Sequence, residues 1–439
     1  MLLNIDQLMN DVQASVVTSV SGYVKEVIGL VVHASPLIAP IGSLCEITTN
    51  TGKVIPAGIV GFKGQTTLLM SYGELEGISQ NDAVKVIETT QHVSVGNHLL
   101  GRILDGFGQP IDSMGIKDSL LKQNIFCQAP DPLKRPKINE PLSLGIRSID
   151  GLLTIGKGQR VGVFAGTGVG KSVVIGMIAK YSKADVIIIC LVGERGREVR
   201  EFIENDLGQE ALKRSVVVVS TSEKPALQRV RSVFVATSIA EYFRDQGKNV
   251  LLIMDSITRV AMAQREIGLS AGEPPATKGY PPSVFNLLPK FLERAGRSEK
   301  GSITGIYTVL LEGDDINDPI GDTARGILDG HIVLSRALAA KGQYPAVDVL
   351  NSISRVAPLI ISKNILMCQQ KLRALMASYH EAEDLINIGA YVKGSNKEVD
   401  KAIEMRQSIK NFIMQGMDEH SNFEDTMKKI QTLGAMANI

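Results

Sequence analysis

The sequence contains little that could form a metal or disulfide framework. Only four of its 439 residues are cysteine, they are widely separated, and no Cys-x-x-Cys pair occurs. The six histidines form no His-x-x-x-His pair either, so ordinary structural histidines are the simpler interpretation. Isolated thiols without such a framework are typical of a protein of the reducing cytoplasm.

Excess charge of one sign and long apolar runs are also missing. Lys and Arg number 47 and Asp and Glu number 46, so no overall field attracts nucleic acid or anionic lipid. The longest apolar runs, such as 186–192, have the length of a strand and are too short to cross a bilayer. No Lys or Arg precedes Lys25, which excludes the basic start of a signal peptide. We therefore expect a soluble protein, at most attached peripherally to a membrane machine.

The most informative feature that is present is a glycine-rich segment, Gly166-Thr-Gly-Val-Gly-Lys-Ser172. With Ala165 it matches the phosphate-binding pattern G-x-x-x-x-G-K-[ST], except that alanine replaces the first glycine. An apolar run at 160–165 indicates a buried strand before the loop, and 173–180 indicates a helix after it. The alternative is a glycine-rich turn with an exposed lysine, but the flanking strand and helix favour a nucleotide site.

Each part of this loop has an expected role. Gly166, Gly168 and Gly170 let the backbone turn its N–H groups toward an anion, and the helix that follows adds its positive dipole end. Lys171 would reach the β- and γ-phosphates of a nucleotide, and the Ser172 hydroxyl would bind Mg²⁺. The predicted nucleotide-binding residues of the loop are Ala165, Gly166, Thr167, Gly168, Val169, Gly170, Lys171, Ser172 and Val173.

Two acidic residues follow other apolar runs. Asp255 ends the run 250–254, and an aspartate at this place in a P-loop protein sits beside Mg²⁺ and orients its waters. Glu194 follows the run 186–192, and open α/β sheets place their ligand sites at such strand ends. A carboxylate there could hold a water in line for attack on the γ-phosphate.

The charged residues after Glu194 allow two interpretations. Arg195 and Arg197 could steady the site, and Arg195 is kept as a catalytic candidate. Alternatively, the segment is a charged helix start held by pairs such as Glu194 with Arg197. Glu198 and Glu201 fit this second interpretation better, as a solvated face.

The N-terminal part, residues 1–92, predicts a helix followed by a barrel. Apolar residues recur at helical spacing in 2–20. From Gly22 to about Glu88, turn signals separate short β-branched runs, which is typical of a small antiparallel barrel. This part holds four Lys or Arg against eight Asp or Glu, a poor surface for a phosphate backbone.

The rest of the chain predicts an α/β core at 93–357 and a helical part at 358–439. In the core, strand-like runs alternate with helical patterns, which indicates a mostly parallel sheet covered on both faces. The helical part is interrupted at Lys393 and Gly394. The expected strands are 161–165, 186–192, 215–220, 250–254, 303–311 and 331–335.

An arginine and a tyrosine lie near the end of the α/β core. Arg355 follows Leu350-Asn-Ser-Ile-Ser354 on what we expect to be a polar loop, and Tyr344 lies just before this stretch. The arginine could neutralise charge in a transition state, and the tyrosine could offer a flat surface to adenine. On spacing alone, a surface arginine and a packed tyrosine are the simpler interpretations.

These segments together resemble the type III protein-export ATPases, which are relatives of the catalytic subunits of rotary F-type ATPases. The resemblance runs from about Gly22 to the C-terminus. The string Ala261-Met-Ala-Gln-Arg-Glu-Ile267 favours the flagellar branch over the injectisome branch. The segments that carry the resemblance are the phosphate loop, Gly193-Glu-Arg-Gly-Arg-Glu-Val-Arg200, Leu251-Leu-Ile-Met-Asp-Ser-Ile-Thr-Arg259, the proline-rich Gly272 to Ser283, and Asp329-Gly-His-Ile-Val-Leu-Ser-Arg336.

The resemblance implies a P-loop (RecA-like) ATPase core with an N-terminal antiparallel β-barrel and a C-terminal helical domain. It implies Mg²⁺-dependent ATP hydrolysis that energises protein export. In this enzyme Glu194 positions the attacking water, Asp255 serves Mg²⁺, and Tyr344 stacks on adenine. Arg355 acts across a subunit boundary, which one kind of chain can achieve by closing a head-to-tail ring.

The resemblance also implies an assembly and its partners. The ring is a homohexamer, and the stiff loop expected at 267–285 faces its pore and touches a coiled-coil stalk protein. The N-terminal helix meets a regulatory, stator-like partner, and the C-terminal part docks export chaperones with their substrates. The complex works in the cytoplasm, peripherally attached to the export gate of the inner membrane, and binds no nucleic acid.

Two other classes share parts of this pattern. An ATP-synthase catalytic subunit predicts a phosphate loop with all its glycines and dependence on a second, related subunit. A hexameric RNA-translocating ATPase needs a basic, aromatic-bearing N-terminal barrel, which the acidic balance of residues 1–92 does not support.

Overall fold

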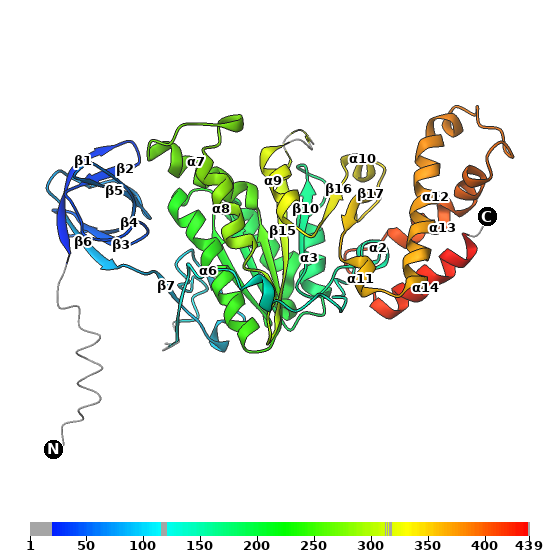
Figure 1. Ribbon diagram of the computed structural model, residues 1–439, viewed down its shortest axis with the longest axis horizontal. Helices are drawn as coiled ribbons and strands as arrows, with labels where there is room; N and C mark the ends of the chain where they lie inside the picture. Colours follow the sequence, from blue (N-terminus) through cyan, green and yellow to red (C-terminus); the bar gives the residue numbers. More distant parts are fainter. Residues whose placement is uncertain (1–19, 116–120, 312, 314, 316–317, 438–439) are drawn as a thin grey trace, which may run out of the picture.

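The computed structural model describes residues 20–115, 121–311, 313, 315 and 318–437. A small barrel, an α/β core and a group of helices follow one another along the longest axis, so the barrel and the C-terminal helices lie at opposite ends (Figure 1). The predicted fold class is therefore confirmed. The helix expected within 2–20 lies outside the described residues, apart from Val20.

Six antiparallel strands close into the N-terminal barrel, in the order β1–β2–β5–β4–β3–β6. Closure pairs the edge strands with each other, so the barrel needs no charged or bulged edge to prevent aggregation. Inward-facing Val24, Ile47 and Leu69 belong to a small apolar core of its own. The strands are β1 (Ser21–Ile28), β2 (Val31–Ala34), β3 (Leu44–Thr48), β4 (Val54–Lys63), β5 (Thr66–Ser71) and β6 (Ala83–Glu88).

The core is built on a nine-stranded sheet in the order β17–β16–β10–β15–β13–β11–β12–β8, with β14 paired to β15. Neighbouring strands are parallel except β14 and the edge strand β17. Each of the six predicted strands is present within one residue at either end, whereas β8, β14 and β17 were not predicted. The strands are β8 (Ile103–Leu104), β10 (Arg160–Ala165), β11 (Val186–Val192), β12 (Ser215–Ser220), β13 (Asn249–Asp255), β14 (Gly296–Arg297), β15 (Ser302–Leu310), β16 (Gly330–Leu334) and β17 (Val347–Ser354).

The sheet separates two apolar cores, because alternate residues of its strands point to opposite faces. Ile188 and Leu252 face one core, which α6 (Ala226–Asp245), α7 (Ile257–Ser270) and α8 (Pro282–Leu292) complete. Ile187 and Leu251 face the other core. That second face is covered by α2 (Arg147–Leu152), α3 (Lys171–Tyr181) and the C-terminal helices.

Smaller elements complete the connections of the core. Two short strands, β7 (His92–Ser94) and β9 (Lys122–Asn124), pair as a separate ribbon. The other helices of the core are α4 (Gly196–Glu201), the π-helix η3 (Phe202–Leu207), α5 (Gly208–Leu212), α9 (Pro319–Ile327), α10 (Arg336–Ala340) and α11 (Ala357–Ile360). Short 3₁₀ turns lie at Asn97–Leu99, Pro132–Lys134 and Thr277–Gly279.

Two expectations about loops were wrong. Residues 350–354 belong to β17 and not to a polar loop. This strand forms because Val347 and Val349 face the core, and the polar residues that follow them face outward or pair with β16. The loop expected at 267–285 is shorter, since α7 continues to Ser270 and α8 begins at Pro282. Proline suits the first turn of a helix, where its missing N–H costs no hydrogen bond.

The C-terminal part consists of α12 (Lys363–Asn387), α13 (Lys397–Ile413) and α14 (Phe423–Met436), and the predicted break falls between the first two. Buried side-chain amides tie these helices to the core. Gln369 Nε2 donates to the Gly151 carbonyl at 2.8 Å, and Gln415 Oε1 accepts from the Arg147 backbone N–H at 2.8 Å. Among the described residues, no helix combines the length and apolarity needed to cross a bilayer.

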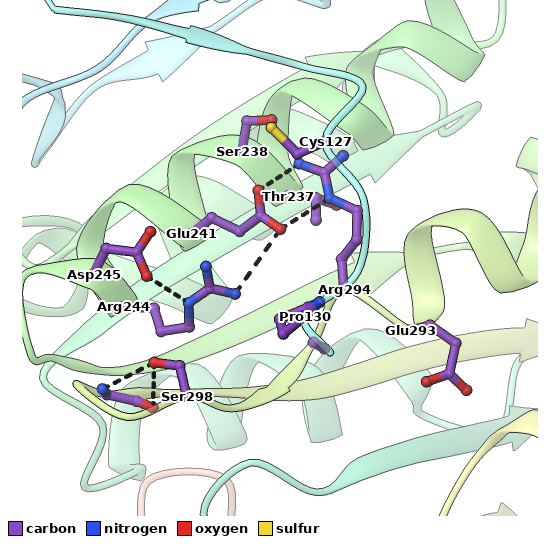
Figure 2. A network of polar contacts seen from close by, with 12 residues as sticks. Cys127, Pro130, Thr237, Ser238, Glu241, Arg244, Asp245, Glu293, Arg294 and Ser298 are labelled. Atoms are coloured by element: carbon purple, nitrogen blue, oxygen red, sulfur yellow. Dashed lines mark hydrogen bonds and ion pairs between the residues drawn. The ribbon is translucent and has the colours of Figure 1, made fainter. Parts of the chain in front are cut away.

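A buried arginine fixes the segment that connects the barrel with the core (Figure 2). Arg294 donates to Glu241 at 3.0 and 2.5 Å, to Ser238 at 2.8 Å, and to the Ile125 carbonyl at 2.6 Å. A buried charge is tolerated only with such complete pairing, because an unpaired one costs several kcal/mol. The neighbouring Glu293 extends away from this network (Figure 2).

Candidate nucleotide site

The phosphate loop connects the end of β10 with the start of α3. Gly168 and Gly170 have φ values of 77° and 87°, in the left-handed region that favours glycine. Helix α3 begins at Lys171, and its N-cap residue, Gly170, has no side chain to satisfy the first backbone N–H groups. These groups and the positive end of the helix dipole are suited to a phosphate.

The Lys171 ammonium group lies between two carboxylates. Its Nζ forms an ion pair with Glu194 Oε1 at 3.3 Å and a second, shorter one with Asp255 Oδ1. Burial lowers the Lys171 pKa, but the charges of Asp255 and Glu194 outweigh it and hold the pKa above its ordinary value. The lysine is not the exposed residue of a bare glycine-rich turn, because only 12% of its side chain is accessible.

Asp255 ends β13 and is held rigidly from the neighbouring strand. Thr308 on β15 donates its Oγ1 hydrogen to Asp255 Oδ1 at 2.6 Å. Asp255 pairs in register with Leu191 of β11, so the ends of β13 and β11 lie side by side. The parallel order of the strands therefore brings Asp255 and the residues after β11 to the same edge as the phosphate loop.

Glu194 lies two residues beyond the end of β11. The loop is anchored by Gly193 N, which donates to the Ser220 carbonyl at 2.7 Å, and by Ser222 N, which donates to the Glu194 carbonyl at 3.0 Å. Burial raises the Glu194 pKa against the opposing charge of Lys171, and the charge of Asp255 and a hydrogen bond with Glu198 add to the increase. A half-buried carboxylate held in this way can accept a hydrogen bond from a water near the phosphates.

The donor groups suit a magnesium ion that arrives with a nucleotide. Ser172 presents an exposed hydroxyl in the first turn of α3, and Asp255 supplies a carboxylate near the same loop. Mg²⁺ takes only one or two protein oxygens in such sites and completes its shell with phosphates and waters. The residues present therefore fit Mg²⁺.

Tyr344 lies next to the phosphate loop of the same chain. A Cβ placed on Gly170 would lie 3.6 Å from its ring atom Cε1, and the residue is 49% exposed. The Tyr344 carbonyl accepts the Gln415 backbone N–H at 3.0 Å, so the C-terminal part holds the tyrosine in place. The ring can offer a face to a flat base bound beside the loop.

The structure does not bring Arg195 to the phosphate loop. Its side chain is 78% exposed and pairs with Glu198 at 2.6 Å on the outer side of α4. The segment is a charged helix start with such pairs, as the second interpretation expects. The particular pairing of Glu194 with Arg197 was wrong, because Arg197 pairs with Glu201 and Glu194 pairs with Lys171. A catalytic role of Arg195 stays a prediction.

Arg355 lies at the opposite end of the sheet. Ser354 of β17 pairs with Gly330 at the start of β16, and β16 runs parallel to β10. Lys171 follows the far end of β10, a strand of six residues, which at about 3.3 Å per residue spans about 17 Å. Arg355 is exposed, and within the described part of the chain its guanidinium makes only long contacts, to the carbonyls of Leu328 at 3.4 Å and Arg325 at 3.5 Å. It therefore cannot serve the phosphate loop of its own chain.

Three residues of the site were missed in the sequence. Thr308 orients Asp255, and Gln415 holds Tyr344, but neither lies in a recognisable local pattern. Arg259 was part of the quoted Leu251 to Arg259 segment, which was the available signal. Its side chain packs against Gly193, and its buried Nε has no hydrogen-bond partner among the described residues. Because its buried Nε–H has no acceptor in that part of the chain, the Arg259 guanidinium, which lies beside the residue before Glu194, is suited to bind an anionic group.

A phosphate loop between a parallel strand and a helix, with carboxylates on two neighbouring strand ends, defines a P-loop ATPase. Comparison with family models agrees with this class. Residues 145–354 match the nucleotide-binding domain of the ATP synthase alpha/beta family, and residues 361–432 match the T3SS EscN ATPase C-terminal domain.

Individual relatives narrow the family further. The flagellum-specific ATP synthase of Bacillus subtilis is 54% identical over 94% of both chains. The type 3 secretion system ATPase of Xanthomonas euvesicatoria is 48% identical over 94% of this chain and 93% of its own. The assembled ATPase EscN of enteropathogenic E. coli superimposes with a TM-score of 0.90 at 45% identity, over 94% of this chain and all of that one. The chain therefore belongs to the type III export ATPases of the ATP synthase alpha/beta family, which are ATP-hydrolysing enzymes of protein export.

Proposed function

We propose that this chain is the flagellar member of the family and hydrolyses Mg·ATP to energise the export of flagellar proteins. The observation that carries the catalytic part is the meeting of Lys171, Glu194 and Asp255 at one edge of the sheet. The flagellar assignment is supported by the string from Ala261 to Ile267 and by the identity to the flagellum-specific protein of B. subtilis.

The residues of the site divide the work of hydrolysis. The loop N–H groups and Lys171 bind the β- and γ-phosphates, and Tyr344 stacks on adenine. When bound, Mg²⁺ neutralises phosphate charge and is held by Ser172 and Asp255. As Lys171 turns to the phosphates, Glu194 is released from its ion pair and orients a water in line with the γ-phosphorus. Glu194 is the better candidate than Glu198, whose carboxylate pairs with exposed Arg195.

Arg355 completes the site of a neighbouring subunit. Its exposure and its distance from the phosphate loop of its own chain support a role in trans. A guanidinium reaching the γ-phosphate from another subunit stabilises charge that develops only in the transition state. Because one chain carries both the loop and the arginine, identical subunits in a closed head-to-tail ring complete each other's sites.

The active form is a homohexamer around a stalk. Two structures support this assembly, that of the assembled EscN and that of EscN with its central stalk EscO, to which this chain superimposes with TM-scores of 0.90 and 0.87. The loop at 271–281 faces the pore. Residues 1–92 bind a stator-like regulator, residues 93–357 hydrolyse ATP, and residues 358–439 dock chaperone–substrate complexes. The ring works in the cytoplasm, attached peripherally to the inner-membrane export gate.

Two experiments test this function. Phosphate release by the purified full-length chain is measured against protein concentration, with and without Mg²⁺. A turnover per chain that rises steeply with concentration supports the ring, and a turnover that is independent of concentration contradicts shared sites. For the branch, the gene is expressed in strains lacking either the flagellar or the injectisome ATPase. Restored swimming supports the flagellar assignment, and restored injectisome secretion alone refutes it.

A further inference from the structure

An ion-pair cluster next to Arg355 is not used by the mechanism above. Asp329, directly before β16, accepts three hydrogen bonds from Arg160, the first residue of β10. Its Oδ2 accepts from the Arg160 backbone N–H and from Nε, each at 3.0 Å, and its Oδ1 accepts from Nη2 at 3.1 Å. A carboxylate held by both branches of a guanidinium has a fixed orientation as well as a favourable energy.

A second carboxylate holds the same arginine from the other side. Glu293 lies 2.5 Å from Arg160 Nη1, and only 15% of the Arg160 side chain is accessible. The residue after Glu293 is Arg294, whose guanidinium is held by Glu241 of α6 in the buried network (Figure 2). Arg160 is therefore held between two carboxylates at the start of β10, and its contacts fix the position of Asp329.

The backbone of Asp329 carries this rigidity to Arg355. The Asp329 carbonyl accepts the Arg355 N–H at 3.0 Å, and the Asp329 N–H donates to the Arg160 carbonyl at 2.8 Å. Among the residues that the structure describes, the Arg355 guanidinium has, in contrast, only the contacts of 3.4 and 3.5 Å to carbonyls at the end of α9 and directly after it. The base of the side chain is fixed while its tip stays free to reach outward.

We propose that Asp329, held by Arg160, is a positioning residue for Arg355. Its carboxylate fixes the start of β16 to β10, and its carbonyl fixes the point from which Arg355 extends to the neighbouring subunit. This inference rests on the trans role of Arg355 in the proposed function. A displacement of about 1 Å of a positioned group can lower a rate by about 100-fold, so this anchor affects turnover without touching the nucleotide.

A double-mutant cycle on the full-length hexamer tests the proposal. Asp329→Asn keeps the size of the side chain but removes its charge. It also removes one of the two carboxylate oxygens that accept hydrogen bonds from the Arg160 guanidinium. Turnover at saturating Mg·ATP is measured for wild type, Asp329→Asn, Arg355→Ala and the double variant, with ring assembly checked by light scattering. We expect Asp329→Asn to lower turnover by about 10-fold to 100-fold, with unchanged affinity of the monomer for a fluorescent ATP analogue. In the Arg355→Ala background, the same change should alter turnover less than about 2-fold, because residues that act through one another are not additive.

Asp322→Asn is the matched control, since it removes one exposed charge from α9 and should leave turnover within about 2-fold of wild type. Wild-type turnover of Asp329→Asn, or an equal loss in both backgrounds, would overturn the positioning role. If Asp329→Asn does not fold, Arg160→Lys replaces it in the same cycle, because lysine keeps the charge but not the two-branched contact. Normal turnover of Arg355→Ala would refute the trans arginine itself, whereas an additive cycle with an inactive Arg355→Ala would refute only the role of Asp329.

Discussion

The two ends of the nine-stranded sheet are built differently. At the carboxyl end, Lys171, Glu194 and Asp255 are half-buried or buried, and the lysine pairs with both carboxylates. At the amino end, Arg355 is exposed and loosely held, although the backbone beneath it is fixed. One chain thus carries a pre-organised nucleotide site and, about one strand length away, a single cation directed outward. This difference is what we expect of a subunit whose site is completed by its neighbour.

The largest effect is expected at the carboxyl end, from Lys171→Ala. The loss removes the main counter-charge of the γ-phosphate, so ATP hydrolysis should fall below detection. Glu194 and Asp255 are left without their shared cation, and protonation of Glu194, whose pKa burial already raises, should keep the fold intact. Phosphate release and thermal unfolding are measured together, with Lys183→Ala, an exposed change just beyond α3, as the control. Hydrolysis by folded Lys171→Ala would refute the nucleotide site.

The next effect is expected at the amino end, from Arg355→Ala. Binding of ATP to the monomer should be unchanged, while turnover of the ring should fall by roughly 10³-fold or more. Mixing Arg355→Ala with Lys171→Ala creates boundaries with an intact loop on one side and an intact arginine on the other, and part of the activity should return. An arginine that acts within its own chain offers no such route.

Absence of recovery in this mixture has a second explanation, since the ring could need every site. Arg355→Ala is therefore also titrated into wild type. A loss of activity that is steeper than the fraction of variant would show that one defective site stops the ring. A proportional loss together with absent recovery would contradict the trans arrangement.

Glu194→Gln should lower turnover by about 100-fold or more while ATP binding persists, because the amide cannot accept the proton of the positioned water. Nucleotide-loaded rings should accumulate, which single-turnover measurements detect. Glu198→Gln is the comparison variant, and its turnover should stay close to that of wild type. If instead Glu198→Gln is the inactive one, the water-positioning role belongs to Glu198.

Thr308→Val tests how much of the site depends on the rigidity of Asp255. The buried carboxylate loses a hydrogen bond worth about 1.5–3 kcal/mol, and about 10-fold slower turnover with a raised requirement for Mg²⁺ is expected. Tyr307→Phe is the control on the same strand, since the Tyr307 hydroxyl has no hydrogen-bond partner among the described residues. Equal activities of the two variants would remove Thr308 from the site.

The smallest effect is expected in the dependence of kcat/KM on pH. Burial, the charge of Asp255 and the hydrogen bond with Glu198 raise the Glu194 pKa. The ionised carboxylate that orients the water is therefore lost at a higher pH than in an ordinary glutamate. Glu198→Ala removes the smallest of these three causes and should move the acidic limb of kcat/KM to lower pH. An unmoved or raised limb would show that Glu194 does not determine it.

Much of the carboxyl-end site follows from local sequence. The phosphate loop, Asp255 and Glu194 each stand at the end of an apolar run, and in parallel sheets such ends converge on one edge. The six predicted strands were found for the same reason, since strands buried on both faces are continuous apolar runs. The alternation of these strands with helices also sufficed for the fold class.

The amino-end arrangement was decided by the tertiary structure alone. Strand β17 returns antiparallel along the edge of the sheet, and this reversal places Tyr344 beside the phosphate loop and Arg355 at the far end. Thr308 contacts Asp255 because β15 lies beside β13 in the sheet, and Asp329 contacts Arg160 because β16 lies beside β10. The order of these strands in the sheet differs from their order along the chain. Periodicity reports which face of a strand is buried, but the strand order that brings distant polar residues together is set by the packing of the whole core.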